Sequence, residues 1–414
     1  REALVPSGLD RVSWKTAIGL PAWLERRRMQ VLSCRTGPQL RRVCEQFAEA
    51  GSHTKDVDEA LVRVWLKLSE RFAVAKRTLA QTYSDHEDVL VPPARVLAVG
   101  DGAAAIAALR EQFPEAQITA VERTDDRLKV SADVSAGPGV TLTRSLVDVA
   151  RRGLGKFDLV TCAWHLSDVK GRKACDAAVA LLWGCVAPNG VLVIFEDGHD
   201  EPFVQTARSR LLNEHSHASP DQNATMVAPC PTDGRCPLLK LPFEWPGGSR
   251  ARDQDLIALP GRRKCTFTQM VSPPTSGPAL RSVGSTTAGN VIRSRNTIHK
   301  FSYAVLRKGR RPERDPVTAR VLETPIKNSR HVIVDFCTGD GPALDRLTFT
   351  KGKAVRASFS YNLARRITWG SRIQFRDPSE RQPLLSASDE DDLDYDDDED
   401  AFDGGGTRRF RLLM

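Results

Sequence analysis

The sequence lacks any long apolar run, and this absence narrows the class of protein. Its longest apolar stretch, residues 177–187, is broken by Gly184, whereas a membrane-spanning helix needs roughly 20 apolar residues. Hydrophobic residues still make up 41% of the 414, which is enough for a buried core. We therefore expect a soluble chain of two or three domains that has no membrane partner.

The sequence also lacks the signs of a disulfide framework. Its nine cysteines are an odd number, and no secretory signal accompanies them. We expect the thiols that sit on helical or strand patterns to be inert packing groups. These are Cys34, Cys44, Cys162, Cys175 and Cys185.

Acidic residues are scarce relative to basic ones, except in one segment. Residues 389–403 hold eleven acidic side chains and no Lys or Arg. Removing these eleven negative charges from the net charge of +8 leaves +19 on the rest of the chain. Such a basic body favours phosphate-rich partners such as RNA, although a merely soluble basic surface is the alternative. We expect the acidic tail to be disordered and solvated.

The arginine-rich residues 1–43 contain few acids. This composition is typical of a mitochondrial matrix protein near its processed start. A helix that faces RNA would have the same composition.

The pattern of apolar residues divides the chain into five regions. Residues 1–92 are predicted to be largely helical, because Leu61, Val64, Trp65, Leu68 and Phe72 fall at helical spacing. Residues 93–212 alternate between short apolar strands and helices, which predicts a parallel, doubly wound α/β sheet. The expected strands are 95–99, 118–121, 140–142, 157–163 and 191–195.

The remaining regions are less regular. Residues 213–298 are rich in Pro, Gly, Ser and Arg and form a cysteine-containing insertion, which is too long for an ordinary loop. Short strands return in residues 299–376, beginning with 301–306, and predict a small β-rich C-terminal region. Residues 377–414 form the tail that carries the acidic segment.

A nucleotide-type pocket is predicted where the first strand ends. Gly100, Asp101 and Gly102 follow that strand and open a helix, and Glu122 ends the second strand. Glycines let a ligand approach the backbone, and an acid at the second position can accept both hydroxyls of a ribose. This order predicts a class I S-adenosylmethionine (SAM) methyltransferase-like, Rossmann-like core.

Two positions depart from the usual SAM pattern. Ala98 stands where SAM enzymes usually carry an acid, and Ala104 stands where many carry a third glycine. The core therefore either binds SAM or is a structural fold with an empty pocket.

Four further cysteines suggest a metal site. Cys230 and Cys236 lie in a proline-flanked loop, Cys265 follows in the same insertion, and Cys337 ends a strand. Four thiolates can bind a tetrahedral zinc ion or a [4Fe–4S] cluster. The five residues between Cys230 and Cys236 exceed the usual zinc spacing of roughly two to four, which favours iron–sulfur. Four unrelated loop thiols remain the alternative.

These motifs resemble those of the methyltransferase-like proteins of the mitochondrial ribosomal small subunit. That family carries Pro-Cys-Pro-His-x-x-x-Cys-Pro, then Cys-x-Phe-Ser-Gln, Phe-Ser-Tyr-x-x-Leu-Arg, Cys-x-x-x-Gly and Trp-Gly-Asp. The counterparts here are Pro229-Cys-Pro-Thr-Asp-Gly-Arg-Cys-Pro237, Cys265-Thr-Phe-Thr-Gln269, Phe301-Ser-Tyr-Ala-Val-Leu-Arg307, Cys337-Thr-Gly-Asp-Gly341 and Trp369-Gly-Ser371. The resemblance covers about residues 60–371. Departures include Thr232 for His, Ser371 for Asp, and Glu196-Asp-Gly-His199 for Glu-Pro-Gly-Thr.

The resemblance implies a function and a ligand set. Cys230, Cys236, Cys265 and Cys337 would ligate a [4Fe–4S] cluster. The protein would be an assembly factor in the mitochondrial matrix that contacts small-subunit rRNA, ribosomal proteins and other assembly factors. Activity as a SAM-dependent rRNA methyltransferase is the alternative, with Gly100, Asp101, Gly102 and Glu122 as the cofactor-binding residues.

Overall fold

The computed structural model describes the two β sheets and most of the helices around them. The described residues are 16–33, 67–86, 90–100, 102–135, 137–151, 156–215, 219, 222–234, 236, 238, 264–273, 296–309, 318–338, 344–351, 361, 362 and 364–374. Predictions for Cys34, Cys44, Leu61, Val64, Trp65 and the acidic tail lie outside them, and the arginine-rich residues 1–43 are described only at 16–33.

The large sheet has a parallel half that matches the predicted alternation of strands and helices. Its order is β3-β2-β1-β4-β5-β8-β6, and neighbours from β3 to β5 run parallel. The parallel strands are β1 (Arg95–Gly100), β2 (Gln117–Val121), β3 (Val140–Thr143), β4 (Phe157–Ala163) and β5 (Val186–Asp197). This arrangement confirms the predicted class I methyltransferase-like α/β fold.

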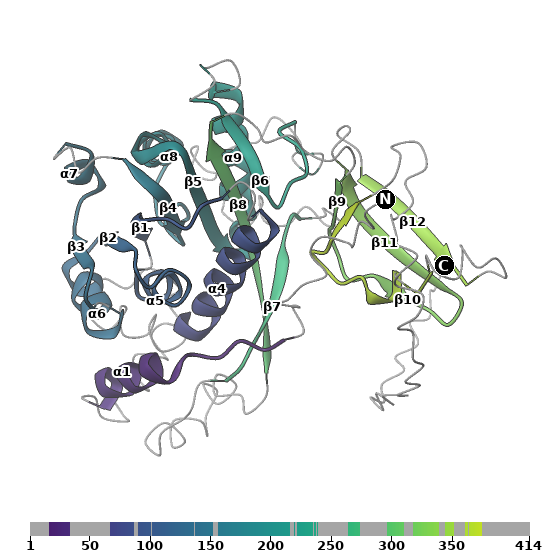
Figure 1. Ribbon diagram of the computed structural model, residues 1–414, viewed down its shortest axis with the longest axis horizontal. Coiled ribbons are helices and arrows are strands. Elements are labelled where there is room, and N and C mark those ends of the chain that lie inside the picture. Colours follow the sequence, from purple (N-terminus) through teal and green to yellow (C-terminus); the bar gives the residue numbers. More distant parts are fainter. Residues whose placement is uncertain are drawn as a thin grey trace, which may run out of the picture.

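Side chains alternate between two cores along each strand, as a sheet covered on both faces requires. In β1, Val96 and Ala98 face one core, whereas Leu97 and Val99 face the other. The first core is covered by α1 (Ala22–Ser33), α4 (Leu68–Asp85), α5 (Gly102–Gln112) and α6 (Asp125–Ser135). The second is covered by α7 (Leu146–Arg151), α8 (Arg172–Cys185) and α9 (Glu201–His215). Figure 1 shows these layers.

Strand β8 (Thr297–Lys308) completes the large sheet by running antiparallel to β5. Its second half also pairs with β6 (Ala224–Ala228), and its first half pairs with β7 (Phe267–Val271). The sequence grouped the strand at 301–306 with the C-terminal region, but the structure places it in the large sheet. The apolar pattern predicts a strand correctly, whereas it does not identify the strand's partner.

A second, five-stranded sheet lies beside the first (Figure 1). Its strands are β9 (Thr318–Val321), β10 (Ile326–Lys327), β11 (His331–Thr338), β12 (Leu344–Thr350) and β13 (Arg372–Gln374). The sheet has its own apolar core, which includes Val321, Val334, Phe336 and Ile373. Among the helices that the structure describes, none combines the length and apolar character needed to cross a bilayer.

Candidate functional site

The four cysteines predicted to bind a metal line a single cavity. Cys230 lies two residues after β6, Cys265 lies two residues before β7, and Cys337 belongs to β11. Cys236 lies further along the loop that follows β6. All four are buried, with exposed fractions between 4% and 9%. The structure therefore brings together side chains that are separated by more than a hundred positions in the sequence.

The convergence of the cysteines follows from strand pairing. Strands β6 and β7 both pair with β8. The chain therefore leaves the sheet beside β8 at the end of β6 and returns to β8 at the start of β7. Both ends of the insertion are thereby fixed next to each other, and the second sheet supplies Cys337 from the other side. The short strands β6 and β7 were not predicted from the sequence, where the whole segment looked irregular.

Two buried arginines hold the backbone around this cavity. Arg208, from α9, donates hydrogen bonds to the carbonyl oxygens of Thr232 (3.0 Å) and Gly234 (2.7 Å) in the cysteine loop. Arg320, from β9, donates to the carbonyl oxygens of Pro229 (3.0 Å) and Gly370 (2.8 Å). Both arginines line the cavity. The loop is thus fixed to both sheets, and two positive charges lie beside the sulfur atoms.

The electrostatics of the cavity suit a thiolate-bound metal. Burial, together with the nearby Cys230 and Cys236 thiols, raises the pKa of Cys337 to about 12. Burial also raises the pKa of Cys265 well above its usual value, again with help from Cys230 and Cys236. The thiols of Cys265 and Cys337 would therefore stay protonated in the protein alone. A bound cation or cluster would stabilise their ionised forms, and Arg208 would offset part of the remaining negative charge.

The predicted nucleotide pocket lies at the carboxyl edge of the parallel strands. Gly100 ends β1, and Gly102 begins α5. Val99 pairs with Val121, so Gly100 lies opposite Glu122, which directly follows β2. The structure therefore brings together three of the four residues predicted to bind the cofactor. Asp101 lies outside the described residues.

Gly100 is required by its backbone conformation and by its close neighbours. Its φ angle of +112° lies in the region that favours glycine. A Cβ atom at this position would lie 2.1 Å from the carbonyl oxygen of Ala163 and 2.9 Å from Cβ of His165. The glycine thus lets β1 end directly against β4, which gives it a structural role as well as a place at the pocket.

Glu122 is almost fully buried, with an exposed fraction of 2%. Its Oε1 atom accepts a hydrogen bond from the hydroxyl of Ser131 on α6, at 2.8 Å. The carboxylate is therefore held against α6 in this structure. A ribose that used both carboxylate oxygens would have to compete with the Ser131 hydroxyl.

The loop after β4 is organised by a buried carboxyl group at the end of β5. Glu196 accepts hydrogen bonds from the backbone N–H of Leu166 (2.8 Å) and from the hydroxyl of Ser167 (2.7 Å). Burial raises the pKa of Glu196 to about 8. His165 in the same loop has its pKa lowered to about 4 by burial and by the charge of Arg123. The histidine is consequently neutral at pH 7.

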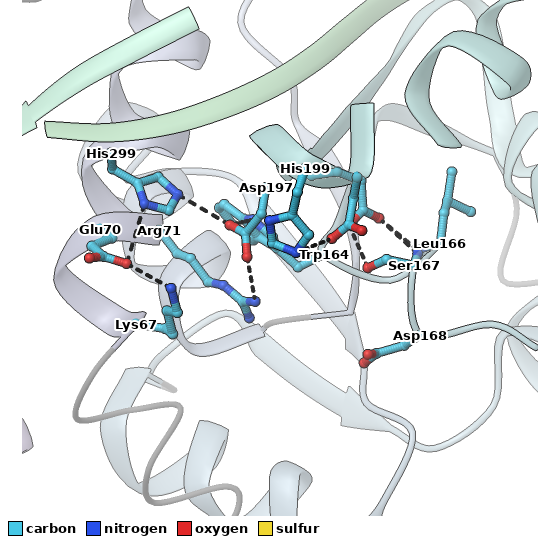
Figure 2. Close-up of polar contacts among 12 residues, drawn as sticks. Lys67, Glu70, Arg71, Trp164, Leu166, Ser167, Asp168, Asp197, His199 and His299 are labelled. Carbon is cyan, nitrogen blue, oxygen red and sulfur yellow. Dashed lines mark hydrogen bonds and ion pairs between the residues drawn. The ribbon is translucent and has the colours of Figure 1, made fainter. Parts of the chain in front are cut away.

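A second polar network at the end of β5 joins three elements (Figure 2). Asp197 accepts a hydrogen bond from Nε1 of Trp164 at 3.0 Å, and its other oxygen lies 3.7 Å from Arg71 on α4. His299 on β8 lies between two carboxylates: its Nε2 is 3.1 Å from Asp197, and its Nδ1 is 3.3 Å from Glu70 on α4.

Charge within this network favours a protonated histidine. Burial opposes protonation of His299, but its hydrogen bonds to Asp197 and Glu70 raise its pKa above the usual value. Burial opposes ionisation of Asp197, yet the bond to His299 and the charge of Arg71 hold its pKa below the usual range. The sequence analysis missed His299, whose only signal was a polar residue within a strand pattern. Asp197 did carry a signal, namely an acid at the carboxyl end of a buried strand.

Comparisons with curated proteins identify relatives in fission yeast. Two Schizosaccharomyces pombe proteins, Rsm22-cox11 tandem protein 1 and tandem protein 2, both described as mitochondrial, are each 28% identical to this chain over 382 residues. The match covers 81% of this chain and 46% of each relative. The chain thus spans about half the length of the curated relatives that it matches.

Similar solved structures are SAM-dependent methyltransferases, at low identity. The N-methyltransferase NodS from Bradyrhizobium japonicum is 12% identical, with a TM-score of 0.32, and the match covers 58% of this chain and 86% of NodS. The plantazolicin methyltransferase BpumL is 9% identical, with a TM-score of 0.33, and the match covers 66% of this chain and 98% of BpumL.

A family model also matches most of the chain. The model described as "Mitochondrial small ribosomal subunit Rsm22" matches residues 58–250 and 259–374. These two segments include all four cysteines of the cavity, the glycines at the end of β1, and Glu122. The chain belongs to the Rsm22 family of the mitochondrial small ribosomal subunit.

Proposed function

We propose that this protein is an assembly factor of the mitochondrial small ribosomal subunit, acting in the matrix. It binds rRNA, ribosomal proteins and other assembly factors, and it carries a [4Fe–4S] cluster on Cys230, Cys236, Cys265 and Cys337. Membership of the Rsm22 family supports the ribosomal role. The observation that supports the proposed cluster is that these four buried cysteines line one cavity between the two sheets.

The geometry of the donors favours a cluster over a single zinc ion. Tetrahedral zinc with bonds of about 2.3 Å holds its sulfur ligands less than about 4 Å apart. In the described part of the chain, no three of the cysteine sulfur atoms lie within 4.8 Å of one another. The one group of three His, Cys, Asp or Glu donors that meets this limit there is Asp197, His199 and Asp200. A cubane cluster is larger than one ion and holds its ligands farther apart. When bound, it supplies iron–thiolate bonds that link β11 to the ends of β6 and β7.

A basic surface on the second sheet supports binding to rRNA phosphates. Exposed cations gather where β10, the start of β11 and the segment 361–366 meet: Lys327, Arg330, Lys351, Arg365 and Arg366. They are neighbours, since the backbone N–H of Lys351 bonds to the carbonyl oxygen of Arg330, and the ammonium of Lys327 contacts the carbonyl oxygen of Arg365. We call these five residues the C-terminal basic patch. Such patches bind phosphate without reading sequence.

The substitution Cys230→Ser tests the proposal. We expect the purified full-length variant to lose iron and the visible absorbance of the cluster, and to bind the isolated mitochondrial small subunit more weakly. Cys185→Ser is the matched control, because Cys185 is also buried but lies on α8, away from the cavity. A Cys230→Ser protein with unchanged iron content and unchanged subunit binding would refute the proposed cluster and its role. Stoichiometric zinc without iron in the wild-type protein would identify a zinc site instead.

Methyl transfer to rRNA is a second candidate function, and one observation favours it. Gly100, Gly102 and Glu122 meet at one edge of the sheet, where SAM could place its methionine and ribose ends. Against it, Glu122 already binds Ser131. Calorimetric titration with SAM distinguishes the two functions: absence of binding at millimolar SAM removes the enzyme hypothesis and leaves the assembly role intact.

A further inference from the structure

A wide groove lies between the two sheets, next to the network of Figure 2. We call it the interdomain groove. Its walls come from the start of α4, the end of β5, the segments beside β7 and β8, and two loops of the second sheet. The lining residues are Lys67, Asp197, Gly198, His199, Lys264, Thr266, His299, Lys300, Glu323, Thr324 and Trp369. It lies at the carboxyl end of the parallel strands, where α/β sheets generally bind their ligands.

The groove offers positive charge to a ligand. Lys264 and Lys300 both line the groove, and among the described residues neither forms an ion pair with a carboxylate. Lys67 is paired with Glu70 at 3.1 Å. The negative charge of Asp197 is already balanced by Arg71 and His299. The other lining acid, Glu323, lies near enough to Arg346 for its charge to raise the pKa of that guanidinium. Lys264 and Lys300 therefore give the groove a positive charge that attracts anions.

An aromatic ring lies in the same wall. Nε1 of Trp369 donates a hydrogen bond to the carbonyl oxygen of Thr266 at 2.8 Å, which fixes the ring against the segment that leads into β7. Gly370 next to it packs against the ring of Phe267, so the backbone of this turn is also held in place. A positively charged groove with a fixed, partly exposed indole has the two elements by which proteins hold single-stranded nucleic acid: phosphate attraction and base stacking.

We propose that the interdomain groove binds an unpaired segment of RNA, with Lys264 and Lys300 at the phosphates and a base stacked on Trp369. This inference rests on the proposed rRNA binding and assigns one part of it to a site. The C-terminal basic patch contacts phosphates alone, and it therefore accepts duplex and single strand equally. Paired bases are not free to stack on a side chain, so the groove selects RNA that is not base-paired.

Binding of a fluorescein-labelled oligoribonucleotide of about 10 nucleotides, within the usual site sizes, tests this proposal. The probe is measured alone and annealed to its complement, with the wild-type full-length protein and its variants. We expect Trp369→Leu to weaken single-strand binding about 10-fold, while Trp369→Phe, which keeps a stacking ring, retains most of it. Affinity falls as salt concentration rises, and Lys264→Ala and Lys300→Ala should each make this fall less steep, by about 0.7 in the slope of log affinity against log salt concentration.

Two controls separate the groove from general charge effects. Arg330→Ala and Arg366→Ala in the C-terminal basic patch should weaken duplex and single-strand binding to the same extent. Lys173→Ala on the exposed face of α8 should change neither. Near-UV circular dichroism of the Trp369 variants verifies that the fold is retained.

The outcomes also distinguish failure of the groove from failure of RNA binding. If the wild-type protein binds both probes and the three groove positions have no effect, the groove proposal is wrong and rRNA binding stands. If the wild-type protein binds neither probe, the proposed function itself fails. Displacement of the single-stranded probe by an oligoglutamate peptide at equal charge would overturn the proposal in favour of an acidic protein segment.

Discussion

At the scale of single residues, the glycine at position 100 can be explained either by a bound cofactor or by the backbone itself. Glycines after a first strand are usually read as ligand contacts, yet Gly100 is also required by a positive φ angle and by the approach of Ala163. The same glycine would therefore persist in a protein that no longer binds a cofactor. Its presence alone does not distinguish an enzyme from a structural fold.

Replacing Gly100 with Ala should destabilise the protein strongly. The added Cβ would meet the backbone of β4 at 2.1 Å, and strain plus overpacking together cost about 2–5 kcal/mol of unfolding free energy. Gly171→Ala is the control, because Gly171 also has a positive φ (+84°) but has nothing within 4 Å of the added atom. It should lose less, about 1–3 kcal/mol, because only backbone strain is added. Urea unfolding curves measure both, and equal losses would contradict the steric argument.

At the scale of secondary-structure elements, the parallel half of the large sheet could be predicted well. Buried parallel strands are short, continuous apolar runs, and each of the five expected runs overlaps an observed strand from β1 to β5. The strands β6 and β7 were missed because each is short and a long polar segment separates them. Their stability comes from pairing with β8, which is a contact distant in sequence and invisible to local patterns.

The free energy of unfolding should depend on pH through His299, which connects β8 to Glu70 on α4 and to Asp197 on β5. Because its folded pKa is raised, the stabilisation from its protonated form is complete below the unfolded value of about 6.5 and is lost as pH rises through the folded pKa. His299→Gln should therefore cost about 2 kcal/mol at pH 6 and less at pH 9. Glu70 and Asp197 contact His299, and their lowered pKa values keep both carboxylates ionised across this range.

Urea unfolding of wild type and His299→Gln at both pH values measures this dependence. Taking the difference between the two proteins removes the contribution of every other titrating group. A difference that stays constant from pH 6 to pH 9 would show that folding does not raise the pKa of His299, and it would contradict the prediction.

At the scale of the whole molecule, the two sheets are joined mainly around the cysteine cavity. Arg320 and Trp369 connect β9 and the turn before β13 to backbone carbonyl oxygens beside Cys230 and Cys265. The sequence indicated the four cysteines as one set, and the structure places them around one cavity. Metal binding at this cavity stays a prediction. The interdomain groove could not be predicted, because it is formed by segments from both sheets that no local pattern connects.

Removal of the metal should loosen the second sheet more than the first. After anaerobic chelation, amide hydrogen exchange should accelerate in β9 and β11, because the cysteine cavity lies between them and the cysteine loop. Strands β1 and β4 lie in the middle of the large sheet and should keep their protection. Equal acceleration in both sheets would indicate that the metal supports the whole fold rather than the junction.

The shared pairing of β8 also constrains the order of events during synthesis. Residues 297–308 supply the neighbour of both β6 and β7, so a nascent chain that has emerged only as far as Cys265 has no partner for either strand. The exposed edge of β5 stays open until that later segment leaves the ribosome. The four cysteines can consequently gather only late in translation, and the proposed metal would be loaded after the sheet is complete.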